Sequence, residues 1–330
     1  MFMKKYKLAL VGATGIVGRT ALEVLSEFDL PISEYTFFSS KRSAGSVLTF
    51  KNKEYIVQEL TDTSFDNHYD FAIFSAGGDT SKHFSPIAAS KGCVVIDNSS
   101  AFRMEKAVPL VVPEVNPEDA FQHSGIIANP NCSTIQAVVP LKTMNDICKI
   151  KRIIYSTYQA VSGAGKKGID DFTNGTTLKF PYNIQNNCLP HIDVFEENGY
   201  TKEEMKMINE TRKILHSPDM KITATTVRVP VLNSHSESIN VEFENDFDLN
   251  EIKNKLLSTK GIIVQDDIKN NIYPLASNTN GHNEVFVGRI RRDYSVPYGL
   301  NFWCVADNIR KGAATNAIQI LKLLIDKDQI

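Results

Sequence analysis

The chain has 330 residues, of which 42% are hydrophobic, so it can bury a large core and is expected to form two domains. Its 36 Lys and Arg residues nearly balance its 38 Asp and Glu residues, which disfavours nucleic acid and anionic membranes as partners. No apolar run approaches the ~18 residues needed to cross a bilayer. Small molecules are therefore the expected partners.

The cysteines indicate a reducing compartment. The five, an odd number, have spacings that match neither a disulfide framework nor a zinc site: Cys93, Cys132, Cys148, Cys188 and Cys304. We therefore predict a cytoplasmic protein with free thiols and no metal. The default interpretation of each cysteine is a buried, inert side chain, so a catalytic role needs local support.

The first 130 residues alternate strands with helical stretches. Lys7 to Val11 is apolar and β-prone, and the glycine-rich run from Gly12 to Gly18 then turns into a helix. Further strands are expected at Tyr35–Ser39, Phe71–Ser75, Val94–Asp97 and Ile126–Ala128. This alternation predicts an α/β fold with a parallel, doubly wound Rossmann-type sheet.

The pattern changes after Asn131. The next strands alternate more clearly and predict an α+β domain whose sheet is mainly antiparallel: Ile153–Gln159, Thr223–Pro230, Ser238–Glu244 and Glu284–Arg291. Helices are expected at Asp170–Asn174, Lys202–Leu215, Leu249–Ser258 and Ala313–Ile325. Because the last helix is expected to pack back on the first domain, the predicted domains are 1–130 with 312–330, and 131–311.

Three glycines carry a dinucleotide-binding pattern. Gly12, Gly15 and Gly18 follow a strand and open a helix, which lets the backbone approach a pyrophosphate at a helix N-terminus. The pattern is weak alone, and its alternative interpretation is a merely structural turn. Its position between strand and helix favours nucleotide binding.

The residues after the second strand favour NADP over NAD. An NAD site usually places an acidic residue there to bind the ribose hydroxyls. This chain instead has Ser40, Lys41, Arg42 and Ser43, whose hydroxyl and guanidinium donors suit a 2′-phosphate. The alternative is a solvated basic loop.

Cys132 differs from the other cysteines in its surroundings. It lies between Pro130-Asn131 and a helix-like run that begins at Ser133, which places its sulfur in a first helical turn. Unpaired N–H groups and the helix dipole stabilise a thiolate there. This position predicts a cysteine nucleophile.

A series of segments resembles the aspartate-semialdehyde dehydrogenase family, in its common bacterial branch rather than the enteric one. The matching segments run in order along nearly the whole chain: Gly12–Gly18, Ser75–Gly78, Asp97–Arg103, Val112–Asn116, Asn129–Gln136, Tyr158–Gly165, Pro190–Asp193, Glu203–Lys206, Val227–Pro230, Ser234–Ser238 and Val287–Arg291. Such a series is far more specific than any single motif.

The resemblance implies a reaction and a place in metabolism. L-aspartyl 4-phosphate and NADPH would be converted reversibly, through a cysteine thioester, into L-aspartate 4-semialdehyde, NADP and phosphate. Such a step serves the biosynthesis of lysine and diaminopimelate, threonine and methionine. The family also implies a homodimer.

The resemblance further implies roles for individual residues. Cys132 would be the nucleophile, His235 the acid/base and Gln159 the residue that orients the acyl intermediate. The substrate-binding set would be Arg228 for the α-carboxylate, Glu204 for the α-amino group, Arg103 with Lys206 for phosphate, and Asn131. The cofactor-binding set would be Gly12, Thr14, Gly15, Ile16, Val17, Gly18, Ser40, Arg42, Ser43, Ser75, Gly77, Ser162, Gly163 and Asn308.

Elementary chemistry agrees with these roles. An acyl phosphate needs a soft nucleophile, and the resulting thioester is electrophilic enough to accept hydride. A departing phosphate needs cationic donors, and a planar carboxylate suits a bidentate guanidinium. Taken singly, Arg103 or Arg228 could be a surface or ion-pair arginine, and His235 a hydrogen-bonded loop histidine.

The alternatives come from two classes, other enzymes and a protein without catalytic activity. N-acetyl-γ-glutamyl-phosphate reductase shares the cysteine chemistry, but its cysteine typically follows Pro-Gly, whereas Cys132 follows Pro130-Asn131. Glyceraldehyde-3-phosphate dehydrogenase is more distant, because its cysteine signature is absent. The non-enzyme alternative is a catalytically silent nucleotide-binding regulator, which the intact Cys132, Gln159 and His235 disfavour.

Overall fold

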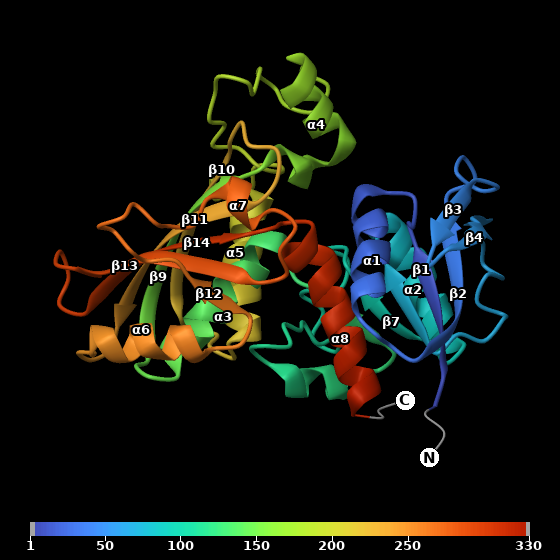
Figure 1. Ribbon diagram of the computed structural model, residues 1–330, viewed down its shortest axis with the longest axis horizontal. Coiled ribbons are helices and arrows are strands. Elements are labelled where there is room, and N and C mark those ends of the chain that lie inside the picture. Colours follow the sequence, from blue (N-terminus) through green and yellow to red (C-terminus); the bar gives the residue numbers. More distant parts are fainter. Residues whose placement is uncertain (1–3, 328–330) are drawn as a thin grey trace. The chain divides into compact units, whose positions relative to one another are not determined.

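The computed structural model describes residues 4–327, which form two compact units. The first unit runs to Pro130 and resumes at Ala313, and the second runs from Asn131 to Gly312 (Figure 1). Residues 1–3 and 328–330, which the predicted domain ranges include, lie outside the described residues.

The first unit is built on a parallel six-stranded sheet in the order β5-β2-β1-β6-β7-β8. The strands are β1 (Tyr6–Val11), β2 (Ile32–Ser39), β5 (Gln58–Glu59), β6 (Phe71–Phe74), β7 (Val94–Asp97) and β8 (Ile126–Ala128). A separate antiparallel hairpin, β3 (Val47–Phe50) with β4 (Lys53–Ile56), follows β2. The predicted doubly wound fold is confirmed.

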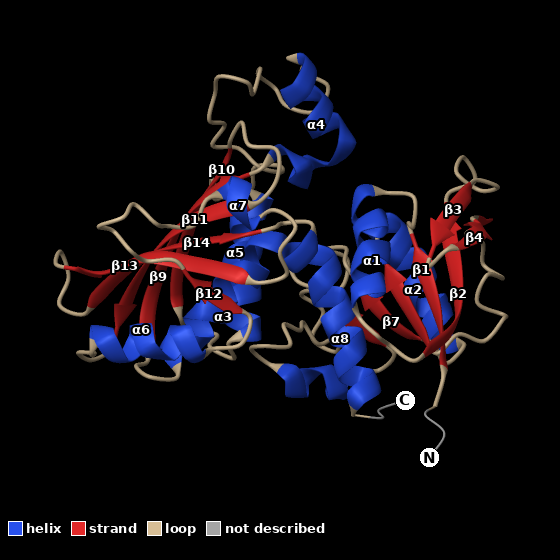
Figure 2. Ribbon diagram, viewed as in Figure 1, coloured by secondary structure: helices blue, strands red, loops and turns tan. Residues whose placement is uncertain are grey.

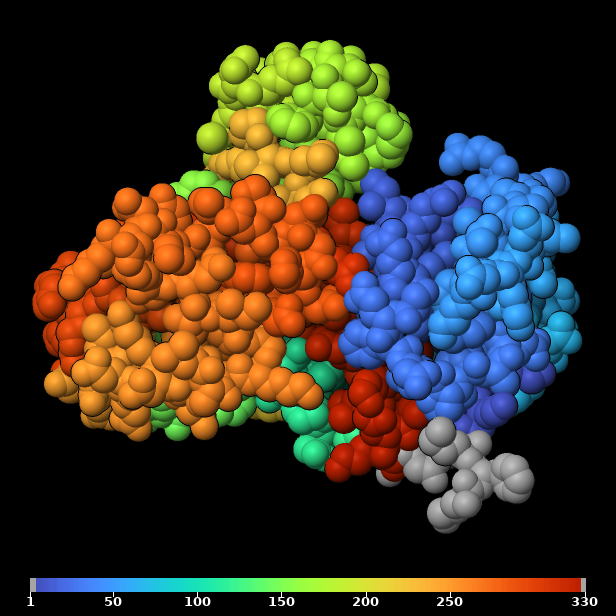
Figure 3. Space-filling view, viewed as in Figure 1, coloured from blue at the N-terminus to red at the C-terminus, as the bar shows by residue number. Residues whose placement is uncertain are grey.

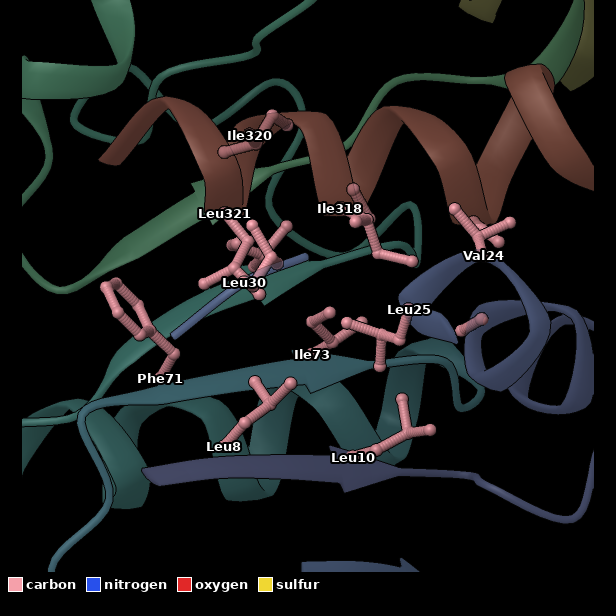
Figure 4. Close-up of a cluster of buried hydrophobic side chains, with 14 of the residues drawn as sticks. Leu8, Leu10, Val24, Leu25, Leu30, Phe71, Ile73, Ile318, Ile320 and Leu321 are labelled. Atoms are coloured by element: carbon pink, nitrogen blue, oxygen red, sulfur yellow. The ribbon is translucent and has the colours of Figure 1, made fainter. Parts of the chain in front are cut away.

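Helices cover both faces of this sheet (Figure 2). On one face, α1 (Ile16–Glu27) and α8 (Thr315–Asp326) pack against the strands through side chains such as Leu25, Ile73 and Leu321 (Figure 4). On the other face, α2 (Gly78–Ser90) packs on a second apolar cluster that includes Phe38 and Phe74. Burial on both faces explains why these strands are continuous apolar runs.

The second unit has a mixed six-stranded sheet in the order β10-β9-β11-β14-β13-β12. The strands are β9 (Ile150–Gln159), β10 (Lys221–Arg228), β11 (His235–Phe243), β12 (Ile262–Val264), β13 (Val285–Asp293) and β14 (Gly299–Ala306). The three central pairings are antiparallel, as predicted, and the pairs β9–β10 and β12–β13 at the two edges are parallel.

Two strands of this unit differ from the prediction. Strand β14, which lies in the middle of the sheet between β11 and β13, was not predicted. Strand β11 was predicted from Ser238 but begins at His235. The residues from His235 to Glu237 are buried in succession, so the alternation that marks the rest of β11 is absent where the strand begins.

Helices α3 (Cys132–Asn145), α5 (Lys202–Ile214) and α6 (Leu249–Ser258) pack on this sheet. The short η2 (Val161–Ala164) and α4 (Gly165–Asn174) follow β9, and a one-turn α7 (Ala276–Thr279) precedes β13. Figure 3 shows the segment around α4 as a lobe that stands out from the body of the unit. A π-helical turn, η3 (Arg310–Ala314), leads into α8, and η1 (Pro117–Gln122) is a short 3-10 helix of the first unit.

Among residues 4–327, no helix combines the length and apolar character needed to cross a membrane.

Candidate active site

The glycine turn of the first unit is shaped by close backbone contacts. Gly12 has a positive φ of 79°, and a Cβ on it would lie 2.3 Å from the Ser75 carbonyl oxygen. A Cβ on Gly18 would lie 2.2 Å from the Gly12 carbonyl oxygen. Both positions therefore require glycine. The turn and α1 contain six predicted cofactor residues: Gly12, Thr14, Gly15, Ile16, Val17 and Gly18.

Two helix N-termini lie at the carboxyl end of adjacent strands in this unit. β1 lies between β2 and β6, so the chain reverses its direction of winding there, and α1 and α2 start after β1 and β6. Gly15 and Gly77 are the N-cap residues of α1 and α2. Unpaired helix N–H groups at such a switch point form an anion-binding site, which fits the pyrophosphate of a dinucleotide.

The predicted 2′-phosphate residues lie directly after β2. The segment forms a turn in which the Ser43 N–H donates to the Ser40 carbonyl oxygen, and Arg42 is exposed. Thr14 and Ser39 are joined by a hydrogen bond of 2.8 Å between their hydroxyl oxygens, which ties the glycine turn to the end of β2.

Cys132 is the first residue of α3, as the sequence predicts. The side chain of Asn131 caps the helix, because its Oδ1 accepts hydrogen bonds from the N–H groups of Ser133 and Thr134. Cys132 is partly exposed, whereas Cys93 and Cys304 are buried and their thiol pKa values are raised by burial. Its position at a helix N-terminus favours the thiolate.

Glu203, rather than Glu204, points toward the Cys132 region. Glu203 Oε1 accepts from Asn131 Nδ2 at 2.9 Å and from Gln159 Nε2 at 3.1 Å. Burial alone would raise the pKa of Glu203, but nearby Lys206 and these hydrogen bonds lower the pKa to about 2. A buried, ionised carboxylate is therefore held beside the helix that carries Cys132.

The predicted role of Glu204 needs correction. Its Oε2 accepts from the Thr201 N–H and its Oε1 from the Thr226 N–H, at 2.7 and 3.0 Å. Glu204 therefore completes the capping box of α5 and is occupied by backbone donors. The sequence offered a signal for this, since Thr201 stands three residues before Glu204.

His235 and Arg228 lie together on the buried side of the sheet. Ala160 contacts both, because its N–H donates to His235 Nδ1 at 2.9 Å and its carbonyl oxygen accepts from Arg228 Nη1 at 2.6 Å. A Cβ on Gly163 would lie 3.0 Å from Arg228 Nη1 and 3.1 Å from His235 Cε1. Burial and the neighbouring Arg228 lower the pKa of His235 to about 3.

Two buried nitrogen atoms at this position face no acceptor among the described residues: Arg228 Nε and His235 Nε2. Buried polar groups normally have partners, so unpaired donors in a site are expected to meet a ligand or water. The pKa of Arg228 is lowered by burial, against the attraction of Glu203 and Cys132. These charged groups therefore belong to one electrostatic cluster.

Gln159, Ser162 and Asn308 border the same cluster. Gln159 Oε1 accepts from the Thr157 hydroxyl at 2.9 Å, which directs its Nε2 toward Glu203. Asn308 Oδ1 accepts from the Ser234 N–H at 2.9 Å, and Asn308 Nδ2 donates to the Ser162 hydroxyl at 3.1 Å. The second unit thus brings together seven predicted site residues from distant parts of the chain, namely Asn131, Cys132, Gln159, Ser162, Gly163, Arg228 and His235.

The two predicted phosphate ligands lie in different units. Arg103, in the first unit, is buried and donates from Nε to the Asn129 carbonyl oxygen and from Nη2 to the Asn98 carbonyl oxygen, both at 2.9 Å. Lys206, in the second unit, donates to Asp193 Oδ2 at 2.8 Å and to Glu203 Oε2 at 3.1 Å. Each cation therefore has hydrogen-bond partners within its own unit.

Comparisons with known proteins agree with this arrangement. Residues 7–123 match the family model of the semialdehyde dehydrogenase NAD binding domain, and residues 141–311 match that of the semialdehyde dehydrogenase dimerisation domain. The aspartate-semialdehyde dehydrogenase of Aquifex aeolicus is 54% identical, over 98% of this chain and 99% of the relative. The chain belongs to the aspartate-semialdehyde dehydrogenase family. Its enzyme class, an oxidoreductase of amino-acid biosynthesis, is as predicted.

Solved structures of this family have the same fold. Aspartate semialdehyde dehydrogenase II of Vibrio cholerae, complexed with ASA, superposes with a TM-score of 0.93 at 45% identity, over 98% of this chain and 99% of that one. The enzyme of Candida albicans with NADP superposes with a TM-score of 0.80 at 26% identity, over 99% of this chain and all of that one. Neither of the two alternatives drawn from the sequence is favoured by these relatives.

Proposed function

We propose that this aspartate-semialdehyde dehydrogenase family member interconverts L-aspartyl 4-phosphate and L-aspartate 4-semialdehyde, with NADPH as reductant and Cys132 as nucleophile. The observation that carries the proposal is the cluster at the N-terminus of α3, where the buried Arg228 interacts electrostatically with both Cys132 and Glu203. This cluster combines a nucleophile with the two opposite charges that a zwitterionic amino-acid substrate requires.

The substrate groups can be assigned to these charges. Arg228 is a buried guanidinium with an unpaired Nε, which suits the α-carboxylate. Glu203 is an ionised carboxylate beside Asn131 and Gln159, which suits the α-ammonium group. We therefore assign the amino-group role to Glu203 in place of Glu204.

The chemistry then follows from the nucleophile. The Cys132 thiolate forms a bond to the acyl carbon while the bond to phosphate breaks, which leaves a thioester. NADPH, when bound, supplies hydride. Uptake of hydride gives a tetrahedral thiohemiacetal oxyanion, whose collapse restores the carbonyl and expels the Cys132 thiolate. Gln159 Nε2 uses one of its two N–H bonds toward Glu203, and its other N–H provides a donor for the oxygen that becomes negative.

The hydrogen bonding of His235 narrows its role. Because the Ala160 N–H donates to Nδ1, the neutral ring carries its proton on Nε2. His235 is therefore set to donate from Nε2 to the reacting oxygen. To take the thiol proton of Cys132 at Nε2, the ring would first have to move its proton to Nδ1 and give up the bond to Ala160. We therefore propose His235 as a neutral hydrogen-bond donor to the reacting oxygen.

Cofactor binding is proposed through the glycine turn of the first unit, with Ser75 and Gly77, and through Ser162, Gly163 and Asn308 of the second. The preference for NADP is proposed to depend on Ser40, Arg42 and Ser43, because the Arg42 side chain is exposed and has no hydrogen-bond or ionic partner among the described residues. Arg42→Ala should raise the dissociation constant for NADPH about tenfold, which is the loss expected for one hydrogen bond to a charged group. The dissociation constant for NADH should stay nearly unchanged. Equal losses for both cofactors would contradict this role.

Arg103 and Lys206 are proposed to bind the phosphate. Alanine at either position should raise the Michaelis constant for phosphate roughly 10- to 100-fold, in the direction that oxidises the semialdehyde. Arg228→Ala provides the contrast, because it should raise the Michaelis constant for the semialdehyde more than the Michaelis constant for phosphate. An unchanged phosphate constant in both the Arg103 and the Lys206 variants would remove this assignment.

A homodimer is proposed from the second unit. Residues 141–311 match a dimerisation domain, and the face of the sheet opposite α3 carries exposed Tyr158 and part-exposed Trp303, whose ring centroids are 5.5 Å apart. Light scattering coupled to gel filtration should give twice the monomer mass of 36.8 kDa.

One assay tests the reaction itself. NADP should be reduced when aspartate semialdehyde and phosphate are both present, and much more slowly with N-acetylglutamate semialdehyde. Turnover that prefers the acetylated substrate, or that does not depend on phosphate, would overturn the proposed function.

A further inference from the structure

Helix α5 carries three buried carboxylates, and each of them needs partners that offset the cost of its burial. Glu203, Glu204 and Glu210 have exposed fractions of 5%, 7% and 1%. Burying a carboxylate is costly unless hydrogen-bond donors or cations compensate for the lost water. Glu204 caps its own helix, and Glu203 faces Gln159 and Lys206. Glu210 has no part in the proposed chemistry.

Glu210 accepts a short hydrogen bond from the residue before the nucleophile. The distance from the Asn131 backbone N to Glu210 Oε2 is 2.6 Å. Glu203 Oε1 accepts from the side-chain Nδ2 of the same Asn131. Residues seven apart lie on one stripe of a helix, about 10 Å from one another along its axis. Two carboxylates of α5 thus hold Asn131 at its backbone and at its side chain.

This double attachment determines where Cys132 is presented. Asn131 Oδ1 accepts from the N–H groups of Ser133 and Thr134, so any movement of Asn131 moves the first turn of α3. On another side, a Cβ on Gly312 would lie 2.9 Å from the Cys132 Cβ and 3.2 Å from its Cα. Position 312 therefore has no space for a side chain beside Cys132. The bonds to Asn131 hold the first turn of α3 in place.

We propose that Glu210 is a positioning residue for Cys132: its carboxylate fixes the Asn131 N–H and thereby the direction in which the first turn of α3 presents the thiol. The inference rests on the proposed function of Cys132 as nucleophile. Glu210 does not touch the reacting atoms and acts through Asn131.

Glu210→Leu and Glu210→Gln test this proposal as a matched pair. Both remove the negative charge and have a similar volume, but only glutamine keeps an acceptor oxygen for the Asn131 N–H. The ratio of the rates of the two variants therefore measures the effect of the hydrogen bond alone. The effect of the lost charge on the thiol is the same in both variants and cancels. Thr211→Val is the control for loss of a buried polar group, because Thr211 is buried on the same helix and bonds Tyr155 instead.

Two readouts are needed. One is kcat with aspartate semialdehyde, phosphate and NADP. The other is the rate at which iodoacetamide modifies Cys132, followed peptide by peptide in a mass spectrometer because Cys148 and Cys188 are also accessible. The alkylation rate does not require turnover, so it tests the positioning of Cys132 even if the proposed substrate is wrong.

Glu210→Leu should lower kcat and the alkylation rate of Cys132 roughly 10- to 100-fold, the loss expected for a hydrogen bond to a charged group. Glu210→Gln should recover most of both, while the dissociation constant for NADP and the Tm of Glu210→Leu stay close to those of Thr211→Val. If Glu210→Leu does not fold, Glu210→Asp, which withdraws the carboxylate by one methylene, must show the same two losses. Losses no larger than those of Thr211→Val, or equal in the leucine and glutamine variants, would overturn the proposal.

Discussion

The two units of the molecule encode their sites in different ways. In the first unit the site is made of backbone, and glycine is required where a Cβ would collide, as at Gly12 and Gly18. In the second unit the site is made of side chains from α3, α5, β9, β10 and β11, whose mutual hydrogen bonds set their charge and direction. A backbone site can be recognised in the sequence, because it requires glycines at a fixed spacing. A network of side chains has no such spacing, because its residues come from distant parts of the chain.

Apart from removal of the nucleophile itself, replacement of His235 should lower the activity most. His235→Asn keeps an acceptor for the Ala160 N–H but removes the Nε2 donor to the negative oxygen, so kcat should fall ~100- to 1,000-fold. Steady-state rates across pH 6 to 9 measure this loss. A kcat within a few fold of the wild-type value would show that His235 takes no part in the reaction.

The adjacent residues Glu203 and Glu204 should respond differently to the same substitution. Glu203→Gln should lower kcat/KM for the semialdehyde roughly 10- to 100-fold, because it removes an ionised partner of the substrate. Glu204→Gln should instead cost about 1 kcal/mol of unfolding free energy through the weakened cap of α5, with kcat/KM within threefold. Kinetics and chemical denaturation of both variants decide this, and the opposite pattern would restore Glu204 as the substrate ligand.

The pair Glu203 and Glu204 also shows the limit of sequence-based prediction. Both residues are glutamates in the same matching segment, and only the direction of each side chain from α5 separates them. Five strands of the first unit, β1, β2, β6, β7 and β8, were predictable because they are apolar runs buried on both faces. The short β3, β4 and β5 of that unit and β14 of the second unit were not predicted. Glu210 and Asn131, which are joined by a hydrogen bond, are 79 residues apart in the sequence. No local sequence pattern predicts such a contact.

The smallest expected effect is on the pH dependence of stability. The pKa of His235 is lowered to about 3 in the folded chain, so below its ordinary value near 6.5 only the unfolded chain takes up this proton. The folded state therefore loses stability as the pH falls from 6.5, by about 0.8 kcal/mol at pH 6 from this group alone. His235→Asn should lose correspondingly less between pH 7.5 and pH 6 in urea denaturation. Equal losses would mean that His235 titrates normally in the folded state.

The proposed mechanism requires the substrate to become covalently attached to Cys132. It is tested most directly by mixing the enzyme with aspartate semialdehyde and NADP in the absence of phosphate, quenching with acid, and mapping the peptides by mass spectrometry. Because phosphate is the acceptor that releases the acyl group in this direction, an aspartyl thioester should accumulate on the Cys132 peptide, disappear when phosphate is added, and be absent in Cys132→Ser, which should have no turnover. An adduct on another residue, or substantial turnover by Cys132→Ser, would contradict the account.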